Sequence, residues 1–463
     1  MAQGVTFVVS IILARLLEPE EYGVLSLVLV FINLANVFIS NGFGEALIQR
    51  KEVEDDDFSS IFWCAFSFAV VIYVVLLLCA PLIGDFYNDE SVPGVLSVLA
   101  LMLPITSINT IQHAYVSRNM QFKKFFFSTL AGSIVSGGVG IVLAYKGFGV
   151  WALVAQTLLN SFVDTIVLLF IVKWYPRFVF KLSSAKALMS YAWKATGASF
   201  INALYGQARA LIIGKVYSTA DLAYYNKGDQ FPTLFIANIN TSICNVTFPV
   251  MASLQENPEE LKRFTRRILK ITTFIIFPLL IGLMGVANEL VIVLLTEKWL
   301  PCVPFMQILC IYWMAQPVQS INWQLLKAMG RSDLCLKLEV VKKVIGFALI
   351  AMTMFISVEA LTISTTAFAI ISMVINIIPN KKLVGYSFSE QIMDILPNLL
   401  LAAGMGIAVF LIGQIKLPAI LVLCVQVLAG IAIYVAGAIL FKIEAGSYCL
   451  EYLSPYLSRF KHR

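Results

Sequence analysis

The sequence has little charge for its length. Of its 463 residues, 13% are Asp, Glu, Lys or Arg and 59% are apolar, whereas soluble proteins carry roughly 25% charged residues. The mean hydropathy is +0.86. So apolar a chain excludes a soluble enzyme, a nucleic-acid-binding protein and a disordered scaffold. The long apolar runs predict an all-α polytopic membrane protein, because an outer-membrane barrel would show short alternating strands.

Residues that bind metals or perform acid–base catalysis are scarce. There are two histidines, His113 and His462, and the eight cysteines form no CxxC pair. We therefore expect no metal site, no cofactor, no disulfide framework and no catalytic centre. No basic segment precedes the first apolar run and no small-residue cleavage site follows it, so we expect no cleavable signal peptide.

Long apolar runs recur along the whole chain. A helix needs about 20 apolar residues to cross the hydrocarbon core, and this length predicts about fourteen spans. In the first half they are 3–17, 23–47, 59–84, 91–114, 125–145, 150–172 and 189–215. In the second half they are 228–252, 271–295, 302–327, 338–357, 361–379, 393–414 and 418–441. The first run is short for a crossing, and all connections are short.

The basic residues predict the orientation of these spans. With the N-terminus inside, 25 of the 33 Lys and Arg residues fall in cytoplasmic segments. Only Lys146, Lys227, Lys298 and Lys416 fall on the opposite face. Since positive charge accumulates on the cytoplasmic side, both termini are expected in the cytoplasm, with the protein in the bacterial inner membrane.

Two distant stretches of the chain are alike. Residues 104–112 (PITSINTIQ) and 317–325 (PVQSINWQL) share Pro-x-x-Ser-Ile-Asn at an offset of 213. An offset of six spans keeps the orientation, so we interpret the stretches as parts of parallel repeats; convergence of two proline-kinked helices is the alternative. The expected organisation is a six-helix lobe at 1–175, a basic linker at 176–188, a second six-helix lobe at 189–380, two further spans within 393–441 and a basic tail at 442–463.

Polar residues recur at helical spacing within several spans. Such residues are costly in lipid and are expected to face the bundle interior. We expect a hydrated cavity whose amides contact sugar hydroxyls; hydrogen bonding between helices is the alternative for any single residue. The residues expected to face the glycan are Asn33, Asn36, Asn160, Asn202, Asn238 and Gln316.

Four basic residues lie within the spans, namely Arg15, Lys194, Arg209 and Lys215. They favour an anionic passenger, and the planar guanidinium of Arg209 suits phosphate oxygens. Arg209 could instead pair with Asp164, and Arg15 and Lys215 could anchor the protein at the outer interface. Asp164 is the only carboxylate expected near the middle of a span, and is therefore the candidate for ion coupling.

Four segments resemble the bacterial polysaccharide-synthesis flippases of the O-antigen and colanic-acid exporter type. They begin LARLLEPEEYGVLSLVLVF, IIGKVYSTADLAYYNKGDQFP, FPLLIGLMGVANELVIVLL and LLKAMGRSDLCLKLEVVKK, and the resemblance covers nearly the whole chain in order. These flippases belong to the superfamily of multidrug, oligosaccharidyl-lipid and polysaccharide exporters. Relatives usually have a basic amphipathic stretch before the first span, and here Met1 stands at the helix.

The resemblance implies a passenger and a mechanism. An undecaprenyl-pyrophosphate-linked oligosaccharide would cross the membrane by alternating access through a V-shaped pair of lobes, with Arg15 and Lys215 among the basic residues that hold the pyrophosphate. It implies the lipid-linked glycan and membrane lipids as partners, with a polysaccharide polymerase and chain-length machinery as candidates, and no nucleic acid. Two alternatives stay open. An organic-cation antiporter would need carboxylates in its cavity, and a membrane-embedded polymerase is usually built around a large outer loop.

Overall fold

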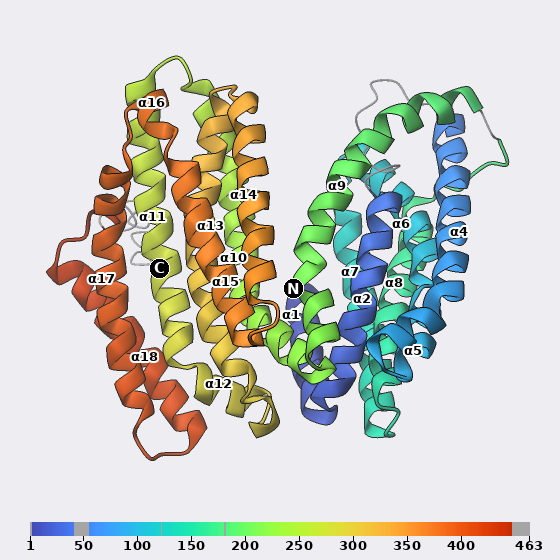
Figure 1. The fold of residues 1–463 in the computed structure, drawn as a ribbon, viewed down its shortest axis with the longest axis horizontal. Coiled ribbons are helices and arrows are strands. Elements are labelled where there is room, and N and C mark those ends of the chain that lie inside the picture. Colours follow the sequence, from blue (N-terminus) through green and yellow to red (C-terminus); the bar gives the residue numbers. More distant parts are fainter. Residues whose placement is uncertain (1, 41–54, 122, 180–181, 447–463) are drawn as a thin grey trace, which may run out of the picture. The chain divides into compact units, whose positions relative to one another are not determined.

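The computed structural model describes residues 2–40, 55–121, 123–179 and 182–446, apart from the side chains of residues 2, 55, 182–195 and 198. Every element in these ranges is a helix, and the chain divides into two compact units, Met1–Ala223 and Tyr224–Arg463 (Figure 1). The helices of unit 1 are α1 (Ala2–Leu16), α2 (Pro19–Ile39), α4 (Asp55–Tyr87), α5 (Ser91–Leu99), α6 (Met102–Arg118), α7 (Lys123–Tyr145), α8 (Val150–Val172) and α9 (Leu182–Val216).

Unit 2 begins at Tyr224, inside the helix that follows α9. Its elements are α10 (Thr219–Ser253), α11 (Pro258–Gly285), α12 (Ala287–Leu294), η2 (Glu297–Trp299), α13 (Cys302–Ala328), α14 (Ser332–Thr353), α15 (Val358–Ile377), α16 (Asn380–Val384), α17 (Phe388–Gly413) and α18 (Ala419–Leu440). The boundary between the units falls within α10, and α9 belongs to unit 1, where it packs on α2 and α4. The predicted division into two repeated six-helix lobes, 1–175 and 189–380, stays a prediction.

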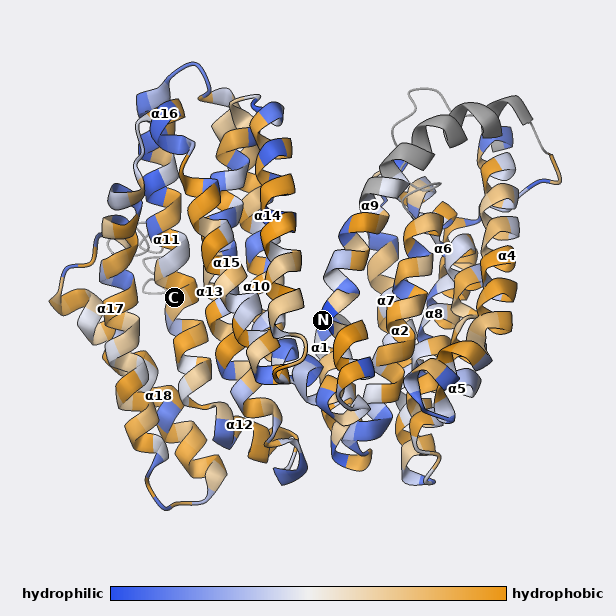
Figure 2. Ribbon diagram, in the orientation of Figure 1, coloured by the Kyte–Doolittle hydropathy of each residue, from blue (hydrophilic) through white to orange (hydrophobic). Residues whose placement is uncertain are grey.

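Each predicted span overlaps a helix. Among the described residues, ten helices are long and apolar enough to cross a membrane. The predicted span 91–114 is broken at residues 100–101 into α5 and α6, and the predicted span 271–295 is broken at Val286 into α11 and α12. Figure 2 shows apolar residues along most of the length of these helices, which agrees with a lipid environment.

The start of α2 packs closely on the start of α10. Glu18 and Glu21 form a capping box at the first turn of α2, and Pro19 occupies the first helical position. One turn later, Gly23 lies against Thr219, so closely that an ideal Cβ on Gly23 would be 1.8 Å from the Thr219 carbonyl oxygen. Glycine is required there because any side chain would overlap backbone.

The segment that follows α8 is held on the surface of unit 1. Trp63 of α4 donates a hydrogen bond to the Arg177 carbonyl at 2.9 Å, and the Arg177 amide donates to Ser59 Oγ at 3.0 Å. Gln112 of α6 donates to the Trp174 carbonyl at 3.0 Å, and the Trp174 ring is buried in an aromatic cluster with Phe58 and Phe62. The beginning of the predicted linker is therefore part of unit 1.

The last two helices dock on α11 through its backbone carbonyls. Pro278 has no amide hydrogen, so the Phe274 carbonyl lacks its helical donor; Tyr434 of α18 donates to that oxygen at 2.8 Å. Gln426 of α18 donates to the carbonyl of Gly285, where α11 ends, at 3.3 Å. Figure 1 shows α17 and α18 beside α11, and α17 packs along its length. The predicted pair of additional spans is thus bonded to its unit at defined atoms.

The Tyr434 hydrogen bond is expected to stabilise unit 2 measurably. Tyr434→Phe removes the donor and leaves the Phe274 carbonyl buried without one, which should cost about 1–2 kcal/mol. Thermal unfolding of the purified protein in detergent should show a lower midpoint. Tyr145→Phe, at a tyrosine that is 73% exposed on α7, is the matched control and should unfold like the wild type. Equal midpoints for both variants would show that the bond contributes nothing.

One lysine that was expected on the outer face is inside unit 2. Lys227 is 5% exposed, donates to Gln230 Oε1 at 3.0 Å and lies 5.5 Å from the centre of the Trp299 ring. Its sequence position at the start of an apolar run suggested a loop, but α10 begins eight residues earlier, at Thr219. Lys227 is therefore buried within α10 and does not lie in a loop. The side of the membrane on which it lies stays a prediction.

Candidate functional site

All four predicted phosphate-binding residues belong to unit 1. Arg15 is in the last turn of α1 and is exposed. Lys194, Arg209 and Lys215 follow one another along α9; the side chain of Lys194 lies outside the described part of the structure. Three of the four predicted residues thus belong to α9, and Arg15 belongs to α1.

Lys215 fixes the end of α9 to the end of α4. Its Nζ donates a hydrogen bond to the Phe86 carbonyl and lies 4.4 Å from the centre of the Phe86 ring. A cation at the C-terminus of a helix is favourable, because the last carbonyls carry partial negative charge. Lys215 is nonetheless exposed, so its ammonium group has room for an anion as well as for this anchoring contact.

Arg209 has a hydrogen-bond donor without a partner among the described residues. Its guanidinium lies 5.6 Å from the centre of the Tyr205 ring, one turn away on α9. Its Nε is buried and has no hydrogen-bond partner among the described residues. Among the described residues, Arg209 forms no ion pair with Asp164. The carboxylate of Asp164 accepts hydrogen bonds from Asn109 and Thr129 instead. A buried guanidinium donor that the protein leaves without an acceptor is a position where an anion can bind.

Helices α2 and α9 run antiparallel beside one another. The rings of Phe38 and Phe200 are 4.9 Å apart at one end of this seam. At the other end, an ideal Cβ on Gly214 would lie 3.0 Å from Leu27. These two contacts define the α2–α9 seam of unit 1, residues 27–38 of α2 and 200–214 of α9.

Three of the predicted glycan-facing amides and Arg209 lie along this α2–α9 seam. Asn33 and Asn202 are exposed, and Asn36 is half-buried. The side-chain oxygen of Asn36 is buried and accepts no hydrogen bond from the described residues. The seam thus combines exposed amides with an unpaired acceptor and an unpaired cationic donor, groups that bind hydroxyls and phosphate oxygens.

Asp164 lies in a hydrogen-bonded cluster between three helices. Asn109 of α6 donates to Asp164 Oδ2 at 2.6 Å and to Thr165 Oγ1 at 3.2 Å, and Thr129 of α7 donates to Asp164 Oδ1 at 3.5 Å. Asp164 is half-buried. Among the described residues Asp164 forms no ion pair with a lysine or arginine, and its hydrogen-bond donors Asn109 and Thr129 are neutral.

Asn160 faces a neighbouring helix more than open space. An ideal Cβ on Gly132 of α7 would lie 2.9 Å from Asn160 Oδ1 and 3.5 Å from the Asp164 Cβ. Its side-chain oxygen is buried, with no hydrogen-bond partner within the described ranges. The close approach of α7 and α8 at this glycine places Asn160 in the helix interface, so a glycan contact there would need the two helices to separate.

The two predicted amides of unit 2 have different surroundings. Gln316 of α13 is half-buried. Asn238 of α10 is exposed and lines a groove of about 520 Å³ between α10 and α11. Half of the residues that line the groove are isoleucines, including Ile239, Ile243 and Ile271. An apolar groove of this kind suits hydrocarbon better than sugar.

The repeated Pro-x-x-Ser-Ile-Asn pattern places an asparagine at the hub of a polar cluster in each unit. In unit 1 the hub is Asn109, bonded to Asp164. In unit 2 it is Asn322, which is fully buried, exchanges two hydrogen bonds of 3.0 Å with Gln391 and accepts a third from Asn380 at 2.5 Å. Sequence analysis missed Asn109 as a site residue, although its place in the repeat was the signal that could have identified it.

The described side chains give no sign of metal chemistry. Within the part of the chain that the structure describes, no three His, Cys, Asp or Glu side chains gather closely enough to hold a metal ion. The groups on the α2–α9 seam and around Asp164 can bind anions, hydroxyls and protons.

Curated relatives of the chain are proteins of bacterial polysaccharide synthesis. The chain is 26% identical to the teichuronic acid biosynthesis protein TuaB of Bacillus subtilis (strain 168), over 81% of this chain and 78% of TuaB. It is 26% identical to the lipopolysaccharide biosynthesis protein WzxC of Escherichia coli (strain K12), over 87% and 84% of the two chains.

Two solved structures share the fold. The lipid II flippase MurJ in an inward closed conformation matches 95% of this chain and 97% of its own, with a TM-score of 0.75 at 14% identity. An inward-facing multidrug resistance MATE family transporter of the MOP superfamily matches 83% and 94%, with a TM-score of 0.64 at 13% identity. At these identities the likeness establishes a MurJ- and MATE-like fold.

The family match decides the classification. The family described as polysaccharide biosynthesis protein matches residues 12–304, well over half of the 463 residues. It includes α2, the Asp164 cluster, the whole of α9 and the first of the two repeat asparagines. This protein therefore belongs to the polysaccharide biosynthesis protein family of multi-pass membrane proteins.

Proposed function

We propose that this protein is a flippase that moves an undecaprenyl-pyrophosphate-linked oligosaccharide from the cytoplasmic to the outer leaflet of the bacterial inner membrane. It does so by alternating access, without covalent chemistry, through about fourteen membrane-crossing helices with both termini in the cytoplasm. The family, the relatives named for teichuronic acid and lipopolysaccharide synthesis, and the fold shared with a lipid II flippase support this proposal.

The observation that carries the proposal is the state of Arg209. A guanidinium whose Nε is buried and unpaired among the described residues, two turns along α9 from the exposed amide of Asn202, offers an anion site on a helix that also carries a group that binds sugar hydroxyls. In the proposed mechanism Arg209 binds the pyrophosphate, with Arg15, Lys194 and Lys215 as further cations. The amides of the α2–α9 seam, with Gln316, contact the glycan.

Transport by purified protein tests the function directly. The probe is undecaprenyl pyrophosphate that carries a fluorescent sugar, reconstituted with the protein in vesicles, and external dithionite destroys only the label in the outer leaflet. We expect the protein to raise the exchange of label between leaflets at least about tenfold over empty vesicles. Protein-independent exchange would contradict the proposal.

A deletion strain separates the alternatives. We expect loss of surface polysaccharide and accumulation of the lipid-linked oligosaccharide. Full export with an altered polymer length would favour a polymerase that works on the same glycans. Normal export together with resistance to cationic dyes on overproduction would favour an organic-cation antiporter, a class that shares this fold.

Asp164 is proposed to couple transport to an ion. Asp164→Asn keeps an acceptor for Asn109 and can donate its amide to the Thr129 hydroxyl, but it lacks the negative charge that would bind a proton or a cation. We expect exchange in vesicles to lose its response to an imposed proton or sodium gradient, while binding of the labelled probe is unchanged. Asp333→Asn, at a carboxylate that is 54% exposed, is the control. A gradient response of wild-type size in Asp164→Asn would exclude Asp164 from coupling.

A further inference from the structure

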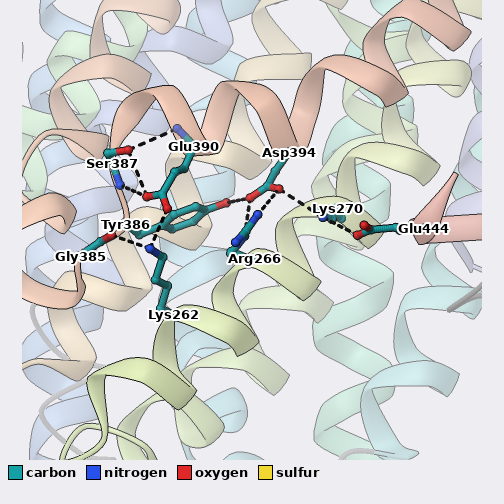
Figure 3. Close-up of polar contacts among 9 residues, drawn as sticks. All are labelled: Lys262, Arg266, Lys270, Gly385, Tyr386, Ser387, Glu390, Asp394 and Glu444. Atoms are coloured by element: carbon teal, nitrogen blue, oxygen red, sulfur yellow. Dashed lines mark hydrogen bonds and ion pairs between the residues drawn. The ribbon is translucent and has the colours of Figure 1, made fainter.

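A network of charged side chains joins α11, α17 and the end of α18 in unit 2 (Figure 3). Asp394 of α17, 6% exposed, accepts from Arg266 through both carboxylate oxygens at 2.8 Å. It also accepts from Tyr386 at 2.7 Å and pairs with Lys270 at 3.2 Å. Burial, together with the hydrogen bond to Asp394, raises the pKa of Tyr386, which keeps its hydroxyl a neutral donor. Both carboxylate oxygens of Asp394 therefore already have partners within the protein.

The network borders a cavity of about 370 Å³ with an excess of positive charge. Arg266, Lys270 and Lys442 line it together with two carboxylates, those of Asp394 and Glu444. Glu444 pairs with Lys270 but is 66% exposed, so water competes for that contact. Among the residues that the structure describes, Lys442 pairs with no carboxylate. The cavity is thus suited to a further anion.

Lys442 occupies a backbone conformation that favours glycine. Its φ is +49°, in the left-handed region, just after α18 ends. The Ile443 amide bonds back to the Ala438 carbonyl at 3.1 Å, which is the helix-ending pattern that usually has glycine at this position. A lysine kept in a strained position beside a cavity indicates that its side chain has a use there.

The cavity continues into an exposed apolar surface. Met393, Leu396 and Leu400 follow at steps of three and four on α17 and are 69%, 41% and 63% exposed. Leu440 and Phe441 at the end of α18 are 75% and 68% exposed. Met393 and Phe441 also line the cavity. A bound molecule can therefore place an anionic group among the cations of the cavity and lay a hydrocarbon chain along α17.

We propose that this cavity binds the phosphate headgroup of an anionic phospholipid. The headgroup contacts Lys442, Arg266 and Lys270, and the acyl chains follow the apolar face of α17. The cavity lies at the end of unit 2 that also carries Lys262, Lys381 and Lys382, so the lipid comes from the leaflet that this basic end faces. This site is separate from the α2–α9 seam, which belongs to unit 1.

Native mass spectrometry of the purified full-length protein tests the proposal. The protein is given equal amounts of phosphatidylglycerol and phosphatidylcholine with identical acyl chains, and we expect phosphatidylglycerol to be retained preferentially. Lys442→Gly should weaken phosphatidylglycerol binding about fivefold, the effect of one basic residue at a membrane surface. Its unfolding midpoint should not fall, since glycine relieves the backbone strain. Glu444→Gln removes a competing carboxylate and should strengthen binding.

A control variant distinguishes a lipid site from a general effect of positive charge. Lys416→Gly removes the same charge from the exposed loop between α17 and α18 and should leave binding unchanged. Equal retention of the two lipids, or equal losses in Lys442→Gly and Lys416→Gly, would overturn the proposal. So would displacement of phosphatidylglycerol by millimolar inorganic phosphate, because the cavity would then be a site for free anions.

Discussion

Replacing Arg209 with alanine is expected to abolish export of the lipid-linked glycan while leaving the protein folded. The variant loses a charged hydrogen-bond donor to phosphate, which should cost about 2–3 kcal/mol and weaken binding of the pyrophosphate about 30- to 150-fold. The fold should survive, because the described contact of the Arg209 guanidinium is with the Tyr205 ring one turn away. Surface polysaccharide, and binding of the labelled probe to purified protein, are the two measurements.

Two further variants show what the Arg209 side chain supplies. Arg209→Lys keeps the charge but loses the planar fork, so we expect intermediate binding. Arg331→Ala removes an arginine that bonds the exposed Asp333 and should export normally. If Arg209→Ala cells make normal surface polysaccharide from wild-type amounts of protein, Arg209 does not hold the pyrophosphate. The flippase function itself would then still be tested by transport in vesicles.

Gly23→Ala is expected to have the largest effect on folding. The added Cβ would lie 1.8 Å from the Thr219 carbonyl oxygen, and backbone cannot rotate away as a side chain can. We expect a loss of about 3 kcal/mol or more, seen as a much lower unfolding midpoint or as little protein in the membrane.

Gly138→Ala is the matched control for this prediction. An ideal Cβ at Gly138 meets nothing within 4 Å, and alanine favours a helix by up to about 1 kcal/mol relative to glycine. This variant should therefore unfold at or above the wild-type midpoint. Equal midpoints for Gly23→Ala and Gly138→Ala would mean that α2 and α10 do not approach each other as closely as described.

Much of the fold could be predicted from sequence, because the positions of long apolar segments along the chain predict where the helices lie. The apolar runs overlap the helices, and the repeat predicts that α6 and α13 correspond. The breaks between α5 and α6 and between α11 and α12 were missed, since apolar residues continue across both. The close contact of Gly23 with Thr219 was also missed, because it depends on how two helices cross.

The candidate site was predicted less completely. Spacing places Gln156, Asn160 and Asp164 on one face of a helix, but it does not say what that face meets. In the structure Gly132 brings α7 against Asn160 and Asp164, and Asp164 bonds Asn109 instead of Arg209. Hydropathy likewise could not show that Lys227 is covered by Trp299. Partners from distant helices are set by packing, which no local pattern encodes.

The carbonyl bonds that join α18 to α11 limit how this protein could be shortened. A version that ends after α16 would leave the Phe274 and Gly285 carbonyls without Tyr434 and Gln426, in a part of the molecule with little water to replace them. Such a truncation would have to restore a residue with an amide hydrogen at Pro278 to repair α11. We expect a relative without these two helices to lack that proline. The residue at position 278 of α11 should therefore depend on whether α18, which begins at Ala419, is present.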